Sequence, residues 1–131
     1  MQRVTGPIPD VRELTRHERE LIRWMLQHGH SSDAAEYLRQ VDRASVVSRC
    51  PCGCASIDLA VDGVAPVPGV SLDVLGDFMW SGPAGEAMGA FVFAKNGRLA
   101  GLEVYSADGL RTPDWLPEPA ELRTLDDSAA G

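Results

Sequence analysis

The sequence predicts an α+β fold: an antiparallel sheet of four to six strands with two N-terminal helices packed on one face. Two observations lead to this fold class. Apolar residues recur at helical spacing within residues 16–41. From residue 44 onward they alternate with a period of two, or they flank turn residues. A chain of 131 residues suits one hydrophobic core, so we expect residues 1–131 to form a single domain.

The first expected helix spans residues 16–28. Thr15 and Glu18 have the spacing of a capping box, in which each side chain accepts a hydrogen bond from the backbone N–H of the other residue. Gly29 is expected to end this helix in a left-handed conformation. A second helix is expected near residues 34–41, after a connection so short that the two helices should touch.

Five strands are expected in the next part of the chain, at residues 45–50, 54–61, 72–80, 88–95 and 98–105. The strongest signal is the Asn-Gly pair at 96–97, because both residues accept the positive φ of a two-residue hairpin turn. This turn would pair Phe93 with Ala100 and Phe91 with Leu102. We expect Phe91 and Leu102 to meet the apolar stripe of the first helix.

The two ends of the chain are expected to be less regular. Residues 1–13 should form an irregular lead-in, because Pro7 and Pro9 disfavour a helix there. A short helical stretch is expected near Ala120 to Leu125, and residues 126–131 should form a disordered tail.

Charge is distributed unevenly along the sequence. Residues 1–50 hold 8 Arg and 7 Asp or Glu, a net charge of +1, whereas residues 51–131 hold 4 Lys or Arg and 12 Asp or Glu, a net charge of −8. A nucleic acid or an anionic membrane surface requires clustered positive charge, so neither is expected as a partner. We expect a protein partner instead, either a second copy of the chain in a homodimer or another protein.

Two features bear on the cellular compartment. The first residues, Met1 to Pro7, lack the charged and then apolar pattern of a signal peptide, and no apolar run approaches the ~18 residues that span a membrane. We therefore expect a cytoplasmic protein whose thiols stay reduced.

All three cysteines lie within five residues, Cys50-Pro51-Cys52-Gly53-Cys54. Pro51 has the φ required at the first position of a type I turn, and Gly53 suits the left-handed position that follows. Cys50 and Cys54 would then end two strands opposite each other, with Cβ atoms ~4.5–5.5 Å apart. This geometry brings three thiols within reach of one metal ion.

A zinc site at this turn needs a fourth ligand, and His28 or His30 (at most one of them) is the expected candidate. Three alternatives remain open. The cysteines could stay reduced and close a hairpin, or Cys50 and Cys54 could form a disulfide. Thirdly, a thiolate oriented by a histidine could act in catalysis. The Cys-x-Cys spacing is not the Cys-x-x-Cys motif of thiol oxidoreductases.

Two segments, Cys50 to Leu59 and Asn96 to Tyr105, resemble a family of small uncharacterised bacterial proteins of actinobacterial type. The resemblance covers about residues 44–120. The family has no assigned activity, so the resemblance implies no catalytic residues. We therefore expect a non-enzymatic binding or protein-interaction module. The first alternative is a zinc-binding module, and the second is a cysteine-dependent enzyme.

Overall fold

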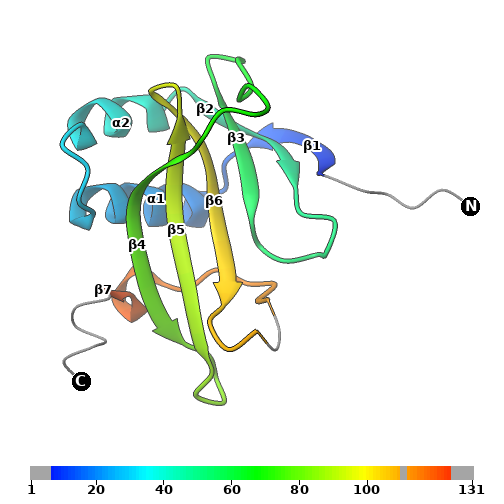
Figure 1. The fold of residues 1–131 in the computed structure, drawn as a ribbon, viewed down its shortest axis with the longest axis vertical. Coiled ribbons are helices and arrows are strands. Elements are labelled where there is room, and N and C mark those ends of the chain that lie inside the picture. The colour runs from blue at the N-terminus through cyan, green and yellow to red at the C-terminus, as the bar shows by residue number, and fades with distance from the viewer. Residues whose placement is uncertain (1–6, 110–111, 125–131) are drawn as a thin grey trace, which may run out of the picture.

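The computed structural model describes residues 7–109 and 112–124. Its strands form one antiparallel sheet of order β1-β2-β3-β6-β5-β4-β7, and two helices cover one face of it (Figure 1). The elements are β1 (Ile8–Glu13), α1 (Arg16–His28), α2 (Ala34–Val41), β2 (Ala44–Arg49), β3 (Ile57–Val61), β4 (Asp73–Ser81), β5 (Ala87–Lys95), β6 (Arg98–Ser106), a 3-10 helix (Pro119–Glu121) and β7 (Arg123–Thr124). The α+β class is confirmed, but the sheet has seven strands in place of the four to six expected.

The two additional strands lie at the edges of the sheet. β1 occupies a region that was expected to be irregular, so the helices follow a strand and do not begin the fold. Pro9 is tolerated in β1 because an edge strand can lack a backbone donor without breaking the ladder. β7 pairs with β4 at the opposite edge, directly after the 3-10 helix. The expected tail, 126–131, lies outside the described residues.

Helix α1 begins at the predicted capping box. The Thr15 side chain accepts from the Glu18 N–H at 3.0 Å, and the Thr15 N–H donates to Glu18 at 2.8 Å. The expected left-handed end is wrong, because Gly29 has φ −81°. Glycine is needed here for another reason: a Cβ on Gly29 would overlap the carbonyl oxygen of Leu75 in β4. The missing side chain lets the end of α1 lie directly on the sheet.

The hydrophobic core lies between the helices and the sheet face that they cover. α1 contributes Leu21, Ile22, Met25 and Leu26, all fully buried. The sheet contributes its largest apolar side chains, including Trp80, Phe78, Met88, Leu102 and Leu59. No helix within the described residues is long and apolar enough to cross a membrane.

A β-bulge decides which residues of the β5–β6 hairpin face this core. Next to the turn, Ala94 pairs with Leu99 as the Asn-Gly signal requires. The register then shifts by one residue, so Phe93 pairs with Gly101 and Phe91 with Glu103. A one-residue shift moves side chains to the other face of a sheet. The expected contact of Phe91 with α1 is therefore wrong, and Phe91 lies on the face away from the helices.

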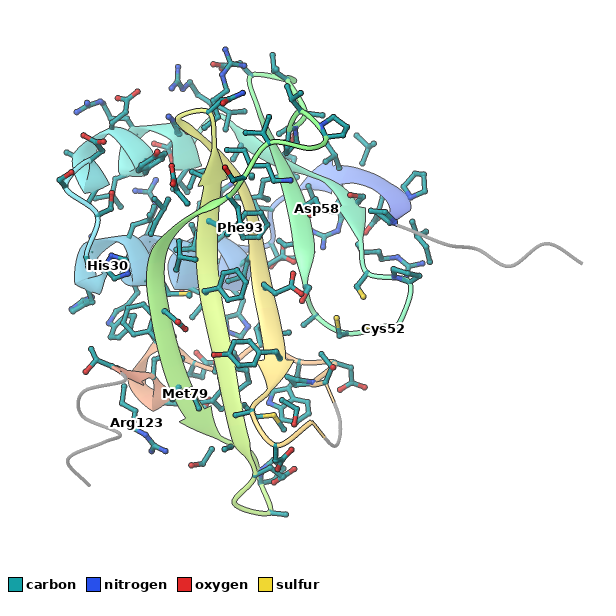
Figure 2. The ribbon with its side chains drawn as sticks, viewed as in Figure 1. His30, Cys52, Asp58, Met79, Phe93 and Arg123 are labelled. Atoms are coloured by element: carbon teal, nitrogen blue, oxygen red, sulfur yellow. The ribbon has the colours of Figure 1, made fainter. Side chains whose placement is uncertain are left out.

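We call that second face the open face, and Figures 1 and 2 look directly onto it. Its central side chains come from β3, β4, β5 and β6, and they are Asp58, Asp77, Met79, Phe91, Phe93, Glu103 and Tyr105. The connection 62–72 from β3 to β4 crosses this face near the β5–β6 turn (Figure 1). The rest of the open face carries no covering element among the described residues.

Candidate metal centre

The cysteine turn has the local geometry that its sequence predicts. The Gly53 N–H donates to the Cys50 carbonyl at 3.2 Å, which closes a turn over Pro51 and Cys52. Gly53 has φ +86°, in the left-handed region that glycine adopts without strain. The proline and the glycine therefore fix the direction in which the chain leaves each cysteine.

The turn sits on a longer loop than expected. β2 ends at Arg49 and β3 begins at Ile57, so Cys50 and Cys54 do not end paired strands. The loop is held in place by other parts of the chain. The Ala55 N–H donates to the Pro113 carbonyl at 3.0 Å, and the buried Ser56 hydroxyl bonds both backbone groups of Val104. These anchors make the cysteine turn a fixed part of the fold.

The three thiols converge on one point. The sulfur atoms of Cys50, Cys52 and Cys54 all lie within 4.8 Å of one another, and Cys50 Sγ is 2.8 Å from Cys52 Sγ. All three are free cysteines, and Cys52 is exposed. Zn–S bonds of ~2.3 Å in a tetrahedron place sulfurs about 3.8 Å apart, a spacing within reach of small side-chain rotations. The group could hold a metal ion.

The thiols also change one another's acidity. Hydrogen bonds from Cys50 and Cys54 favour the charged form of Cys52 and lower its pKa. Cys50, which donates to Cys52 and is partly buried, has its pKa raised to about 12. Without a metal, the cluster thus favours a single thiolate at Cys52. Placing three thiolates together requires a cation among them.

The structure does not bring either expected histidine to the cysteines. His28 stacks on Trp24 with ring centroids 4.2 Å apart, and its Nδ1 lies 2.9 Å from the Trp24 carbonyl oxygen. His30 donates its backbone N–H to Leu75 in β4. In Figure 2, His30 lies at the left of the view, and Cys52 lies at the right, on the loop between β2 and β3. The two histidines are close to the cysteines in sequence but not in space, because β2 carries the chain away from the end of α1 before the cysteine loop begins.

Two residues outside the predicted ligand set lie closer to the cysteines. His17 and Asp114 line a pocket of about 270 Å³ together with Cys54. The His17 Nε2 lies 2.9 Å from the Pro117 carbonyl oxygen. A carbonyl only accepts, so neutral His17 carries its proton on Nε2 and its lone pair on Nδ1. No sequence signal indicates this pocket, because it forms where residues 112–117 return past the cysteine loop.

A second pocket joins the cysteine turn to the open face. Cys50, Asp58 and Glu103 all line it. Asp58 accepts from the Ser48 hydroxyl at 2.7 Å. Burial, together with the charge of Asp58, raises the pKa of Glu103. Glu103 is thus half-buried beside a second carboxylate.

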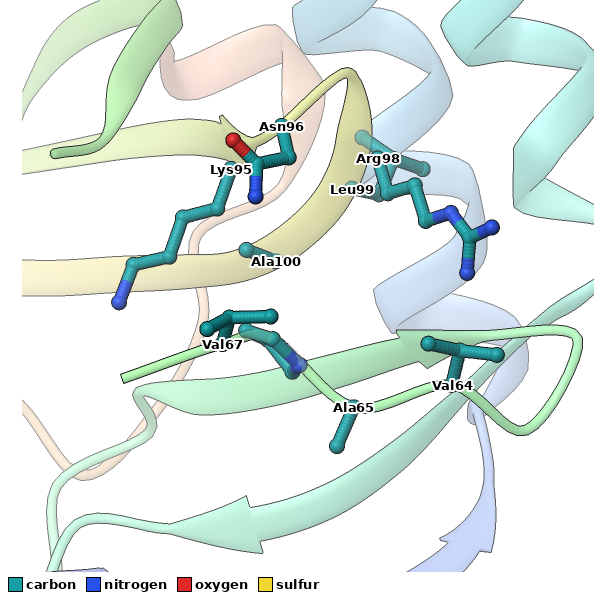
Figure 3. Close-up of a pocket in the computed structure, with 9 residues that line it drawn as sticks. Val64, Ala65, Val67, Lys95, Asn96, Arg98, Leu99 and Ala100 are labelled. Atoms are coloured by element: carbon teal, nitrogen blue, oxygen red, sulfur yellow. The ribbon is translucent and has the colours of Figure 1, made fainter. Parts of the chain in front are cut away.

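A third hollow lies apart from the cysteines, under the β3–β4 connection (Figure 3). It has a volume of about 300 Å³, with Val64 and Val67 on one side and Lys95 and Arg98 on the other. It contains none of the cysteines or of the open-face carboxylates.

Comparison with known proteins does not assign the chain to a family. The chain matches no protein-family model, and no curated protein or solved structure is significantly similar to it. The cysteine turn and the open face are therefore the features from which a function can be inferred.

Proposed function

We propose that the protein is a non-enzymatic, cytoplasmic binding module whose cysteine turn holds one zinc ion. The observation that supports this proposal is the convergence of three Sγ atoms within 4.8 Å on a turn fixed by Pro51 and Gly53. Thiolates are ligands that zinc prefers, and reduced thiols are available in the cytosol. A site that is already arranged binds a metal with little further ordering of the chain.

The three thiols have different roles in this proposed site. Cys52 is the first thiolate, because its pKa is lowered, and Cys50 and Cys54 lose their protons as the ion binds. Water or the carboxylate of Asp114, which lines the pocket beside Cys54, completes the tetrahedron.

A cysteine-dependent enzyme is the second candidate, since Cys52 is exposed and its pKa is lowered. We favour metal binding because the groups that lower this pKa are two further thiols, which are ligands rather than general bases. Alkylation separates the two functions. Iodoacetamide should modify Cys52 first in metal-free protein, and zinc should protect it.

Metal binding is tested with Co²⁺, which reports thiolate ligation by its absorption. We expect one equivalent to bind to the metal-free protein with the spectrum of a tetrahedral, sulfur-rich site. Zn²⁺ should displace the Co²⁺. Cys52→Ser should weaken binding at least about tenfold, because the thiolate is a direct ligand.

Two control variants identify the surroundings of the ion. His28→Ala should leave the Co²⁺ affinity and spectrum unchanged, because His28 stacks on Trp24 and lines a pocket with residues of β4 and none of the cysteines. Asp114→Asn should alter the spectrum if the carboxylate is the fourth ligand, and should leave it unchanged if water is. A protein that takes up no Co²⁺ under reducing conditions would overturn the zinc proposal.

A further inference from the structure

The centre of the open face combines aromatic rings with carboxylates. The ladder pairs Phe91 of β5 with Asp77 of β4 on one side and with Glu103 of β6 on the other. Directly paired residues have Cβ atoms ~4.5–5.5 Å apart. An aromatic ring therefore stands between two carboxylates on one row of the sheet.

Neighbouring rows extend this arrangement. The rings of Phe93 and Tyr105 lie next to Phe91, with centroids 5.8 Å and 6.1 Å away. Asp58 pairs with Gly101 in the row of Phe93. Figure 2 shows Phe93, Asp58 and Met79 on the side of the sheet that faces the viewer, with the helices behind. The result is a strip of aromatic rings bordered by acids.

These acids form no ion pair among the described residues, although His30 lies near enough to Asp77 to lower its pKa and Arg49 lines the pocket that Asp58 and Glu103 share. Among the ion pairs of residues 7–109 and 112–124, none includes Asp58, Asp77 or Glu103. Acids elsewhere are paired, for example Glu18 with Arg12 and Glu36 with Arg39. One carboxylate oxygen of Asp77 is buried without a hydrogen-bond partner in the described structure. Burying a carboxylate oxygen without a hydrogen-bond partner is costly, so a cation brought to this face would be favoured.

We propose that the open face binds a basic segment of another protein, with an arginine or lysine placed over Phe91 and between Asp77 and Glu103. The ring face attracts the cation and the two carboxylates pair with it. The apolar side chains that alternate with the cations of the bound segment would contact Phe93, Tyr105 and Met79. A second copy of this chain is a poor occupant, because its own three acids would meet them.

Burial is a further observation that agrees with a cationic ligand. It raises the pKa of Asp77, against smaller opposing effects of His30 and of a hydrogen bond from Tyr105, and it raises that of Glu103 as well. The free protein thus holds these carboxylates in an unfavourable environment that a bound cation would relieve.

The test uses two synthetic peptides of equal length and NMR spectra of the full chain. In one peptide arginine alternates with valine, and in the other glutamate replaces arginine. We expect the arginine peptide to shift the resonances of Phe91, Glu103 and Tyr105 and to bind more weakly as salt is added. The glutamate peptide should not bind.

Two substitutions locate the site. Phe91→Leu keeps an apolar side chain but removes the π face, and Glu103→Gln removes one charge. Each should weaken binding about fivefold, the effect of one cation–π or charged contact. Glu20→Gln is the matched control: it removes an exposed charge from α1, behind the sheet, and should leave the affinity unchanged.

Three results would overturn the proposal. The first is arginine-peptide binding that Phe91→Leu and Glu103→Gln leave unchanged. The second is equal binding of the glutamate peptide. The third is a dimer in sedimentation whose formation shifts these same resonances without peptide, which would make a second copy the occupant.

Discussion

Two glycines of the open face lie beneath aromatic rings. A Cβ on Gly89 would overlap the ring of Tyr105, and a Cβ on Gly101 would overlap the ring of Phe93. Neither glycine has a positive φ, so the requirement is for space and not for backbone conformation. Each ring therefore packs directly against the strand backbone. Tyr105 covers the backbone at Gly89, and Phe93 covers it at Gly101.

This contact gives a prediction at residue scale. Gly89→Ala should lower the free energy of unfolding by about 1–3 kcal/mol, because the new methyl group displaces the Tyr105 ring. In a Tyr105→Ala background the same substitution should cost much less, since the ring is gone. Urea unfolding of the four proteins measures this coupling. Equal costs in both backgrounds would show that the ring does not occupy this space.

At the scale of elements, a partly buried ion pair joins β1 to α1. Arg12 of β1 donates two hydrogen bonds of 2.9 Å to the carboxylate of Glu18, which is 6% exposed. The same carboxylate accepts the Thr15 N–H. Burial alone would raise the pKa of Glu18, but these hydrogen bonds outweigh it and lower the pKa below 4.5. The glutamate of the capping box thus also holds the edge strand β1.

Glu18→Gln should therefore destabilise the protein by about 1–3 kcal/mol at neutral pH, because Arg12 loses its charged partner. A carboxylate with a lowered pKa stabilises the fold above its unfolded pKa, and this contribution disappears as pH falls through the folded value. The difference from the wild type should shrink below about pH 4.5. Glu20→Gln, in an exposed pair with Arg16, should change stability by less than about 0.5 kcal/mol. Thermal unfolding across pH gives both comparisons.

The elements also show what the sequence could predict. Local signals were sufficient for α1 with its capping box and for the Asn-Gly turn, because each depends on a few neighbouring residues. The face of Phe91 depends on a bulge between Phe93 and Ala94, which no local pattern indicates. β1 became a strand despite Pro9 because a sheet edge was available to it.

The candidate site divides in the same way. The turn of Cys50, Cys52 and Cys54 follows from Pro51 and Gly53, so sequence alone predicted that the thiols converge. The residues that surround the cysteine turn come from segments that are distant in sequence. His17 and Asp114 reach the pocket beside Cys54 through the tertiary fold, whereas His28, closer in sequence, does not.

At the scale of the whole molecule, the uneven charge of the sequence becomes an uneven surface. The arginines of the first half pair largely with acids of that half, as Arg16 with Glu20 and Arg39 with Glu36. The second half supplies the strands of the open face, whose acids have no such partner among the described residues. Unpaired, half-buried carboxylates lower stability, so their presence is typical of a binding surface.

Because burial and Asp58 disfavour the charged form of Glu103, we predict that Glu103→Gln makes the free protein more stable at neutral pH. The expected gain is about 0.5 kcal/mol after allowance for solvent screening. A raised carboxyl pKa means that the folded state binds the proton more tightly, so stability falls as pH rises from 4.5 through the raised value. The gain should therefore vanish below about pH 4.5, where Glu103 is protonated in both states. Urea unfolding at several pH values measures it, with Glu20→Gln as the control that should show no gain. If Glu103→Gln is instead less stable than the wild type at neutral pH, the carboxylate has a stabilising partner and the open face is not held ready for a cation.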